Sequence, residues 1–198
     1  MNFRLIKRLI SQKFVILLLV IVGGCGQPTD PGDETEPRLP DLNTSDGIEI
    51  VTWNLKQFPQ SGRATVDSVT ALMAELNADI YALQEVQNVN SLLSVVNGLE
   101  HFGVVYSRNT SFMRLAILYD STRVRLSDSD ELFVRNDYPF AGRPPLRADF
   151  STVSDGFRFS VTNLHMKCCG GSENIQRRAT AAGLLHAYMD STLSAGVH

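Results

Sequence analysis

Three short polar strings follow apolar, β-rich runs of the chain and limit the folds open to it. They are Thr52-Trp53-Asn54-Leu55, Leu83-Gln84-Glu85-Val86 and Thr162-Asn163-Leu164-His165-Met166-Lys167. Each string places polar side chains at or just past the C-terminal end of a predicted strand. Carboxylate and amide oxygens suit a hard ion such as Mg²⁺, which proteins hold through one or two carboxylates plus substrate phosphates. The pattern therefore predicts a site that handles phosphate.

The remaining hydrophobic pattern alternates between strand and helix spacing. Apolar residues at helical intervals predict helices over 66–76, closed by Asn77, and over 92–99. A third helix is expected from Ser172, with an apolar face of Ile175, Ala179, Ala182, Leu185 and Met189. Strands are expected at 48–53, 79–85, 102–106, 115–119, 124–133, 146–150 and 157–162. This order of elements indicates a layered α/β fold.

In their order, spacing and strand context, the three strings resemble the endonuclease/exonuclease/phosphatase superfamily of metal-dependent phosphoesterases. The resemblance begins near Ile48 and runs to His198. It implies an α/β four-layer sandwich of two mixed β-sheets flanked by helices. Family members continue with a G-D-x-N string and close with an S-D-H string, and neither occurs in these 198 residues. The domain is therefore expected to be C-terminally incomplete, and this polypeptide alone is expected to be inactive.

The resemblance assigns roles to four of the polar residues. It implies that Glu85 ligates Mg²⁺ (Mn²⁺ and Ca²⁺ being alternatives) and that Asn163 and His165 contact the scissile phosphate. Asn54 is the second candidate metal residue, because its side-chain carbonyl can contact the ion or a metal-bound water. From the residues themselves, a carboxylate ending an apolar strand is costly unless it is paired or bound to metal. Asn163 and His165 lie two apart, so both side chains are expected on one strand face. The alternatives are that Glu85 is a surface carboxylate, that Asn54 only forms a turn, and that His165 is an ordinary core or surface histidine.

Three further residues are candidates for binding substrate phosphate. Arg143 lies in a stretch resembling the arginine-proline segment of the family, where the arginine reaches phosphate, although a surface arginine in a Pro/Gly loop fits too. Tyr106 offers a hydroxyl or is a core aromatic residue, and Lys167 meets phosphate or only solvent. Deoxyribonuclease-like relatives carry a glutamate shortly after the tyrosine, whereas Ser107 and Arg108 follow here. This departure argues against the deoxyribonuclease mechanism specifically.

The N-terminus resembles a bacterial lipoprotein signal. Basic residues come first, followed by a short apolar run over 14–22 and then by Gly23-Gly24-Cys25. Residues 1–24 are therefore predicted to be a signal peptide, and Cys25 is predicted to be the acylated first residue of the mature chain. An ordinary signal with an incidental cysteine is the alternative. Residues 25–47 form an acidic, Pro-rich tether, and 48–198 form the partial domain. Gly26 in place of Asp predicts the outer membrane of the bacterial envelope.

Charge and cysteine content narrow the range of partners. The signal contains four basic and no acidic residues of a chain with net charge −3, so the mature protein is more acidic still. No basic face of the kind that binds nucleic acid is evident, which favours phospholipid or small phosphoester substrates without excluding DNA.

Cys168 and Cys169 are adjacent and are predicted to be small buried side chains. A disulfide between neighbouring residues is strained, and no second His/Cys cluster is present to complete a zinc site.

The sequence thus predicts a monomeric, lipid-anchored, Mg²⁺-dependent phosphodiesterase or phosphatase. Its alternative is a catalytically dead envelope lipoprotein that keeps the scaffold as a binding surface.

Overall fold

The computed structural model describes residues 40–42, 47–110 and 112–194. The predicted signal peptide 1–24, the lipidation site Cys25 and most of the tether 25–47 lie outside the described residues. Within the described ranges, no helix has both the length and the apolar character needed to cross a membrane.

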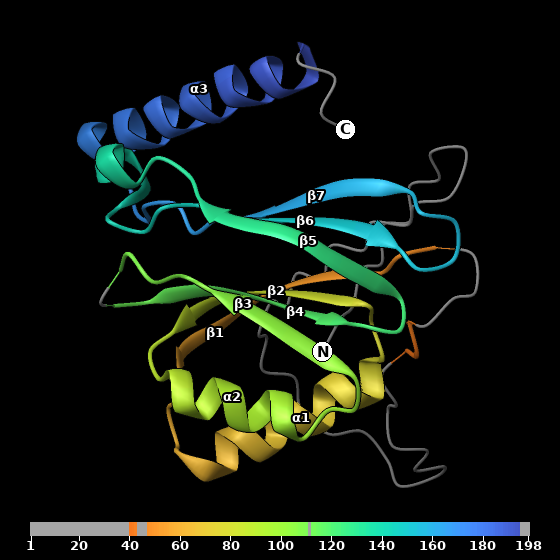
Figure 1. Ribbon diagram of the computed structural model, residues 1–198. Coiled ribbons are helices and arrows are strands. Elements are labelled where there is room, and N and C mark those ends of the chain that lie inside the picture. The colour runs from red at the N-terminus through yellow and green to blue at the C-terminus, as the bar shows by residue number, and fades with distance from the viewer. Residues whose placement is uncertain (1–39, 43–46, 111, 195–198) are drawn as a thin grey trace, which may run out of the picture.

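The predicted order of strands and helices is confirmed, and so is the layered α/β sandwich. Two sheets stack face to face, with α1 and α2 on the outer side of one sheet and α3 on the outer side of the other (Figure 1). The elements are β1 Ile50–Phe58, α1 Arg63–Leu76, β2 Ile80–Val86, α2 Val89–Asn97, β3 Phe102–Tyr106, β4 Arg114–Asp120, β5 Val124–Glu131, η1 Val134–Asn136, η2 Tyr138–Phe140, β6 Leu146–Thr152, β7 Arg158–Asn163 and α3 Ser172–Ser194.

The two sheets differ in strand direction. The first has the order β1-β2-β4-β3 and is mixed, because β1 runs parallel to β2 while β4 is antiparallel to both β2 and β3. The second, β5-β6-β7, is wholly antiparallel among the described residues rather than mixed as expected. The parallel pair needs a crossover, which α1 supplies, whereas antiparallel neighbours need only short connections.

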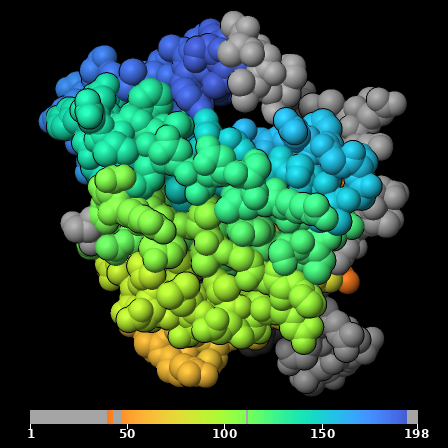
Figure 2. Space-filling model, in the orientation of Figure 1, coloured from red at the N-terminus to blue at the C-terminus, as the bar shows by residue number. Residues whose placement is uncertain are grey.

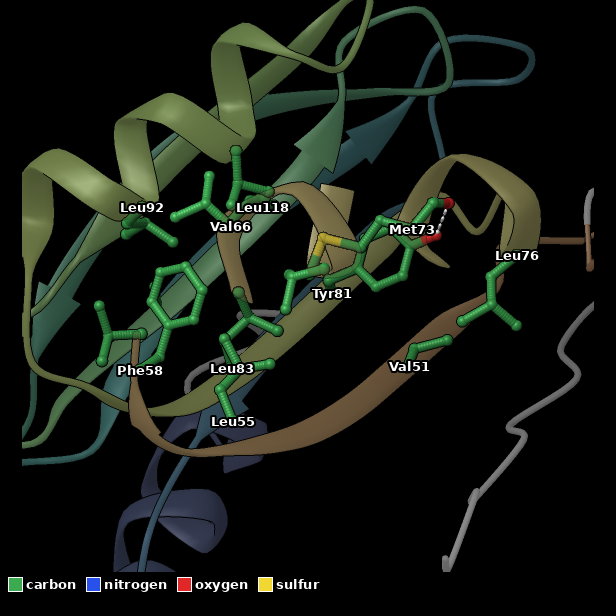
Figure 3. Close-up of a cluster of buried hydrophobic side chains, with 14 of the residues drawn as sticks. Val51, Leu55, Phe58, Val66, Met73, Leu76, Tyr81, Leu83, Leu92 and Leu118 are labelled. Carbon is green, nitrogen blue, oxygen red and sulfur yellow. Dashed lines mark hydrogen bonds between the residues drawn. The ribbon is translucent and has the colours of Figure 1, made fainter. Parts of the chain in front are cut away.

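One hydrophobic core fills the space between the first sheet and its two helices (Figure 3). Tyr81 is fully buried there; its hydroxyl donates a hydrogen bond to the Met73 carbonyl at 2.7 Å and accepts one from the Ala78 amide at 3.0 Å. Burial raises the pKa of Tyr81 to about 12, so the phenol stays protonated and able to donate. Asn77 closes α1 in the left-handed conformation (φ 49°), as predicted.

A second core lies between the two sheets. It contains Ile48, Ile80, Leu115, Ile117, Val124, Leu146, Ala148 and Phe150. Strands β2 and β4 therefore contact one core on each face, which explains why their sequences read as continuous apolar runs instead of alternating ones.

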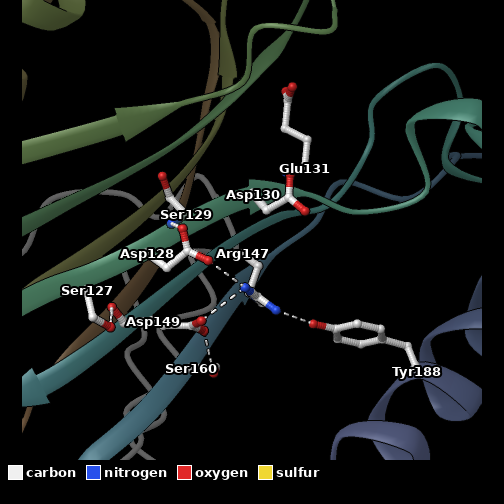
Figure 4. Close-up of polar contacts among 9 residues, drawn as sticks. All are labelled: Ser127, Asp128, Ser129, Asp130, Glu131, Arg147, Asp149, Ser160 and Tyr188. Carbon is white, nitrogen blue, oxygen red and sulfur yellow. Dashed lines mark hydrogen bonds and ion pairs between the residues drawn. The ribbon is translucent and has the colours of Figure 1, made fainter. Parts of the chain in front are cut away.

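The apolar face predicted for α3 is largely exposed. Ile175 and Met189 are 56% and 58% exposed, whereas Ala181 is fully buried. Polar contacts anchor the helix instead: Tyr188 accepts a hydrogen bond from Arg147 at 2.6 Å, and Arg147 also pairs with Asp128 and Asp149 on the second sheet (Figure 4). In the space-filling view α3 lies on the outer surface of the molecule (Figure 2). Spacing alone located the helix but not the side that it buries.

Candidate active site

Two bulges meet where β1 and β2 end. The β1–β2 register shifts between Asn54 and Phe58, and the β2–β4 register shifts between Leu83 and Val86. Glu85 lies in the second bulge with φ 63°, a left-handed conformation that costs a non-glycine residue roughly 1–3 kcal/mol. Bulges next to active sites redirect a side chain. The bulge and the left-handed backbone together set the direction of the Glu85 side chain.

The Glu85 carboxylate is the centre of the site. Asn54 Nδ2 donates to its Oε1 at 2.9 Å, and the backbone N–H of Gln57 donates to its Oε2 at 3.0 Å. His165 Nε2 lies 3.6 Å from the same Oε1. The side chains of Glu85 and His165 are 17% and 20% exposed, so both are accessible but partly screened from water. Residues from β1, β2 and the segment after β7 thus converge on one carboxylate.

Asn54 is held in place from both ends of its amide. While Nδ2 contacts Glu85, its Oδ1 accepts a hydrogen bond from the backbone N–H of Lys56 at 2.8 Å. Lys56 and Gln57 both have positive φ, 49° and 59°, which turns their backbone N–H groups toward the Asn54 and Glu85 side chains. The left-handed pair after Asn54 was not foreseen from sequence, because neither residue is one that favours this conformation.

Arg143 and His165 form the basic side of the site. The half-buried Arg143 donates from Nη2 to the Met166 carbonyl at 3.5 Å. Burial lowers the pKa of Arg143, while the nearby Glu85 acts in the opposite direction. Burial also lowers the pKa of His165, and Arg143 lowers it further against the pull of Glu85, which favours a neutral imidazole near pH 7. Arg143 Nε and His165 Nδ1 are buried and have no hydrogen-bond partner among the described residues.

Asn163 lies beneath this group and joins the two sheets. The residue is 3% exposed. Its Nδ2 donates to the carbonyls of Leu83 at 2.8 Å and Ala116 at 2.9 Å, and its Oδ1 accepts from Gln84 Nε2 at 2.8 Å. The amide thus links β7 to β2 and β4 and faces the interior, whereas His165 follows the strand end and faces Glu85. Gln84 was overlooked in the sequence, although a polar residue inside an apolar strand was the available signal.

The other candidates lie around this centre. Tyr106 ends β3 and packs, partly buried, against the first core, which agrees with its reading as a core aromatic residue. Lys167 is partly buried, and its carbonyl accepts a hydrogen bond from Arg178 at 3.0 Å. Cys168 and Cys169 are exposed free thiols, which corrects the prediction that they are buried. They follow the end of β7 in an irregular segment, and no strand of the described residues includes them.

The residues present fit a hard divalent cation that substrate and water help to hold. Among the described residues, no group of three or more His, Cys, Asp or Glu side chains could hold a metal by itself. A single carboxylate with a neighbouring amide matches Mg²⁺, which keeps several waters and binds substrate phosphates.

Comparison with known proteins gives structural matches only. No protein-family model and no curated protein sequence matches the chain. Zebrafish (D. rerio) TDP2 in complex with a single-strand DNA product matches with a TM-score of 0.58 at 15% identity, over 71% of this chain and 54% of that one. An endonuclease/exonuclease/phosphatase family protein from Bacteroides thetaiotaomicron matches with a TM-score of 0.57 at 17% identity, over 72% and 58%. The chain has the endonuclease/exonuclease/phosphatase fold.

The human Nocturnin catalytic domain, solved with a bound sulfate anion, also matches, with a TM-score of 0.53 at 15% identity over 73% of this chain and 58% of that one. The chain therefore spans little more than half the length of these three structures. At these identities the shared property is the fold.

Proposed function

We propose that this chain carries the metal- and phosphate-binding part of a phosphoester hydrolase site. The observation that supports this most is the strained, half-buried Glu85 carboxylate, which Asn54 orients and which lies 3.6 Å from His165. A carboxylate buried to this extent is stabilised by a cation, and strain at a polar residue is characteristic of functional sites. The fold that the chain shares with known phosphoesterases supports the same reaction class.

Each residue then has a role that its contacts allow. Glu85, with Asn54 holding its orientation, would bind Mg²⁺, or Mn²⁺ or Ca²⁺ in its place. When bound, the cation neutralises negative charge on phosphate oxygens. His165, neutral near pH 7, would donate a hydrogen bond from Nε2 to such an oxygen. Arg143 has guanidinium N–H donors that can bind a second oxygen, and Asn163 would act as a positioning residue that fixes the end of β7.

A phosphodiester is the substrate class that this site suits. Zebrafish TDP2 is seen with a single-strand DNA product, but the present chain has a formal net charge of −3 and a still more acidic mature part. Phospholipids and small phosphoesters fit this charge better than DNA, because tight DNA binding relies on basic side chains that neutralise the phosphate backbone. We infer that the protein works as a monomer.

Binding of Mn²⁺ and inorganic phosphate tests the site directly. We expect Mn²⁺ to broaden the amide NMR signals of residues 52–58, 84–86 and 163–167 selectively. We also expect Arg143→Ala to weaken phosphate binding by roughly 10- to 100-fold, as for the loss of one charge-assisted contact. Arg135→Ala is the matched control, since Arg135 is an exposed arginine in the nearby η1. Uniform broadening, or equal effects of the two variants, would contradict the proposed function.

We further propose that Cys25 anchors the protein to the outer membrane. Its support is the Val22-Gly23-Gly24-Cys25 string and the acidic tether that follows. Several acyl chains are needed for stable anchoring, because one chain gives only marginal binding. Mass spectrometry of the mature N-terminus from the native cell is expected to show a multiply acylated Cys25. An unmodified Cys25, or cleavage at another position, would refute this proposal.

A further inference from the structure

Two adjacent thiols lie on the surface between β7 and α3. The Sγ atoms of Cys168 and Cys169 lie 2.7 Å apart, a close approach that is still longer than an S–S bond, and both residues are exposed. Cys169 has φ 74° and is followed by Gly170 and Gly171, the latter with φ 95°. This left-handed backbone turns the two side chains toward the same side, although neighbours in an extended chain point to opposite sides.

The surroundings favour the thiolate of Cys168. The contact with Cys169 lowers the pKa of the Cys168 thiol most; desolvation raises that pKa, and the nearby cations of Lys167 and Arg143 lower it. The same interaction raises the pKa of the Cys169 thiol. One thiol is thus prepared to attack and its neighbour remains protonated beside it, an arrangement that suits two-step thiol chemistry.

We propose that Cys168 and Cys169 form a dithiol site that reacts with small-molecule disulfides and closes to a reversible disulfide within the segment. The Cys168 thiolate attacks one sulfur of the small disulfide, forms a mixed disulfide and releases one thiolate. The Cys169 thiol then loses its proton and attacks the Cys168 sulfur, which expels the second thiolate. Two cysteine thiols are oxidised, one small disulfide is reduced to two thiols, and the two cysteine protons end on the released thiols.

Reversibility follows from the geometry of neighbouring residues. Consecutive Cα atoms lie about 3.8 Å apart across a trans peptide, closer than the roughly 4.4–6.8 Å of ordinary disulfides. The closed form is therefore strained, and strained, exposed disulfides are the easily reduced ones. The Gly170-Gly171 pair allows the backbone after the cysteines to adjust.

Closure would also act on the carbonyl groups that hold this segment. Arg178 Nη1 donates to the carbonyls of Lys167 at 3.0 Å and Cys169 at 2.9 Å, one on each side of Cys168. Ring closure changes the backbone torsions of Cys168 and Cys169, which orient these two carbonyls, so oxidation is expected to loosen the attachment of this segment to α3.

The test is a mass measurement on one short peptide. The reduced full-length chain is treated with oxidised glutathione, free thiols are blocked with N-ethylmaleimide, and the protein is digested with trypsin. Cleavage after Lys167 and Arg177 releases residues 168–177, which contain both thiols and exclude Cys25. We expect this peptide to be unalkylated and lighter than the dithiol by two hydrogen atoms, and to take up two maleimides after reduction. Hydrogen exchange over residues 164–178 is expected to be faster in the oxidised protein.

Single variants separate ring closure from ordinary thiol reactivity. Within the 168–177 peptide, Cys168→Ser and Cys169→Ser each leave one thiol, and Cys168→Ala with Cys169→Ala leaves none. In Cys169→Ser we expect a persistent mixed disulfide with glutathione, because no second thiol can displace it. A persistent mixed disulfide on the unaltered chain, or two maleimides without prior reduction, would overturn the proposal. The readout needs neither metal nor substrate, so its outcome is independent of the proposed hydrolase function.

Discussion

Glu85→Gln is expected to weaken Mn²⁺ binding by about 10²-fold or more. The substitution keeps the size of the side chain and removes the carboxylate that contacts both Asn54 and His165. A hard cation binds through charged oxygen ligands, and even residues that merely support a ligand change metal affinity by about 10- to 100-fold. Loss of the charged ligand itself therefore has at least that effect. Titration followed by Mn²⁺ relaxation enhancement measures it.

Glu131→Gln is the matched control for this variant. Glu131 also ends a strand, and its carboxylate also accepts backbone N–H groups, from Arg108 at 2.8 Å and Asn109 at 2.9 Å. If the metal binds at the proposed site, Glu131→Gln leaves Mn²⁺ affinity unchanged. Equal losses in the two variants would instead mean that Mn²⁺ responds to the overall negative charge, and undiminished binding in Glu85→Gln would rule out the site.

Asn163→Ala is expected to destabilise the fold by about 3–5 kcal/mol. The change leaves the carbonyls of Leu83 and Ala116 and the amide of Gln84 with one partner fewer in the buried region between the sheets. Each buried carbonyl that loses its Asn163 donor costs about 1–3 kcal/mol, whereas Gln84 Nε2 keeps the Thr52 hydroxyl and the Ala82 carbonyl as acceptors. Urea unfolding monitored by circular dichroism gives the change in the free energy of unfolding.

Ser160→Ala provides the comparison on the same strand. The exposed Ser160 makes one side-chain hydrogen bond, to Asp149 at 2.7 Å, so its loss is expected to cost under about 1 kcal/mol. Equal stability of Asn163→Ala and Ser160→Ala would show that Asn163 does not join the sheets. A large loss for Asn163→Ala alone would establish it as a positioning residue of β7.

Local patterns in the sequence were sufficient to predict the helices and strands. The apolar runs around Ile80 and Leu115 predicted strands because both faces of β2 and β4 are buried, which removes the alternation seen in half-exposed strands. Asn77 predicted the end of α1 because it tolerates the left-handed conformation that closes a helix. The antiparallel character of the second sheet was not predicted, since strand direction depends on pairing between distant segments and leaves little trace in local spacing.

The site was predictable in composition but not in arrangement. The sequence by itself determined which polar residues end the strands, and three of these, Asn54, Glu85 and His165, lie together. Only the tertiary structure decided that Asn163 turns inward to join the sheets, that the thiols of Cys168 and Cys169 are exposed, and that Glu85 adopts a left-handed conformation. These outcomes depend on contacts between residues about 30 to 80 positions apart, such as Asn54 with Glu85 and Asn163 with Leu83. Local propensity cannot encode such contacts, because the free energy that orients these side chains appears only when the two sheets pack together.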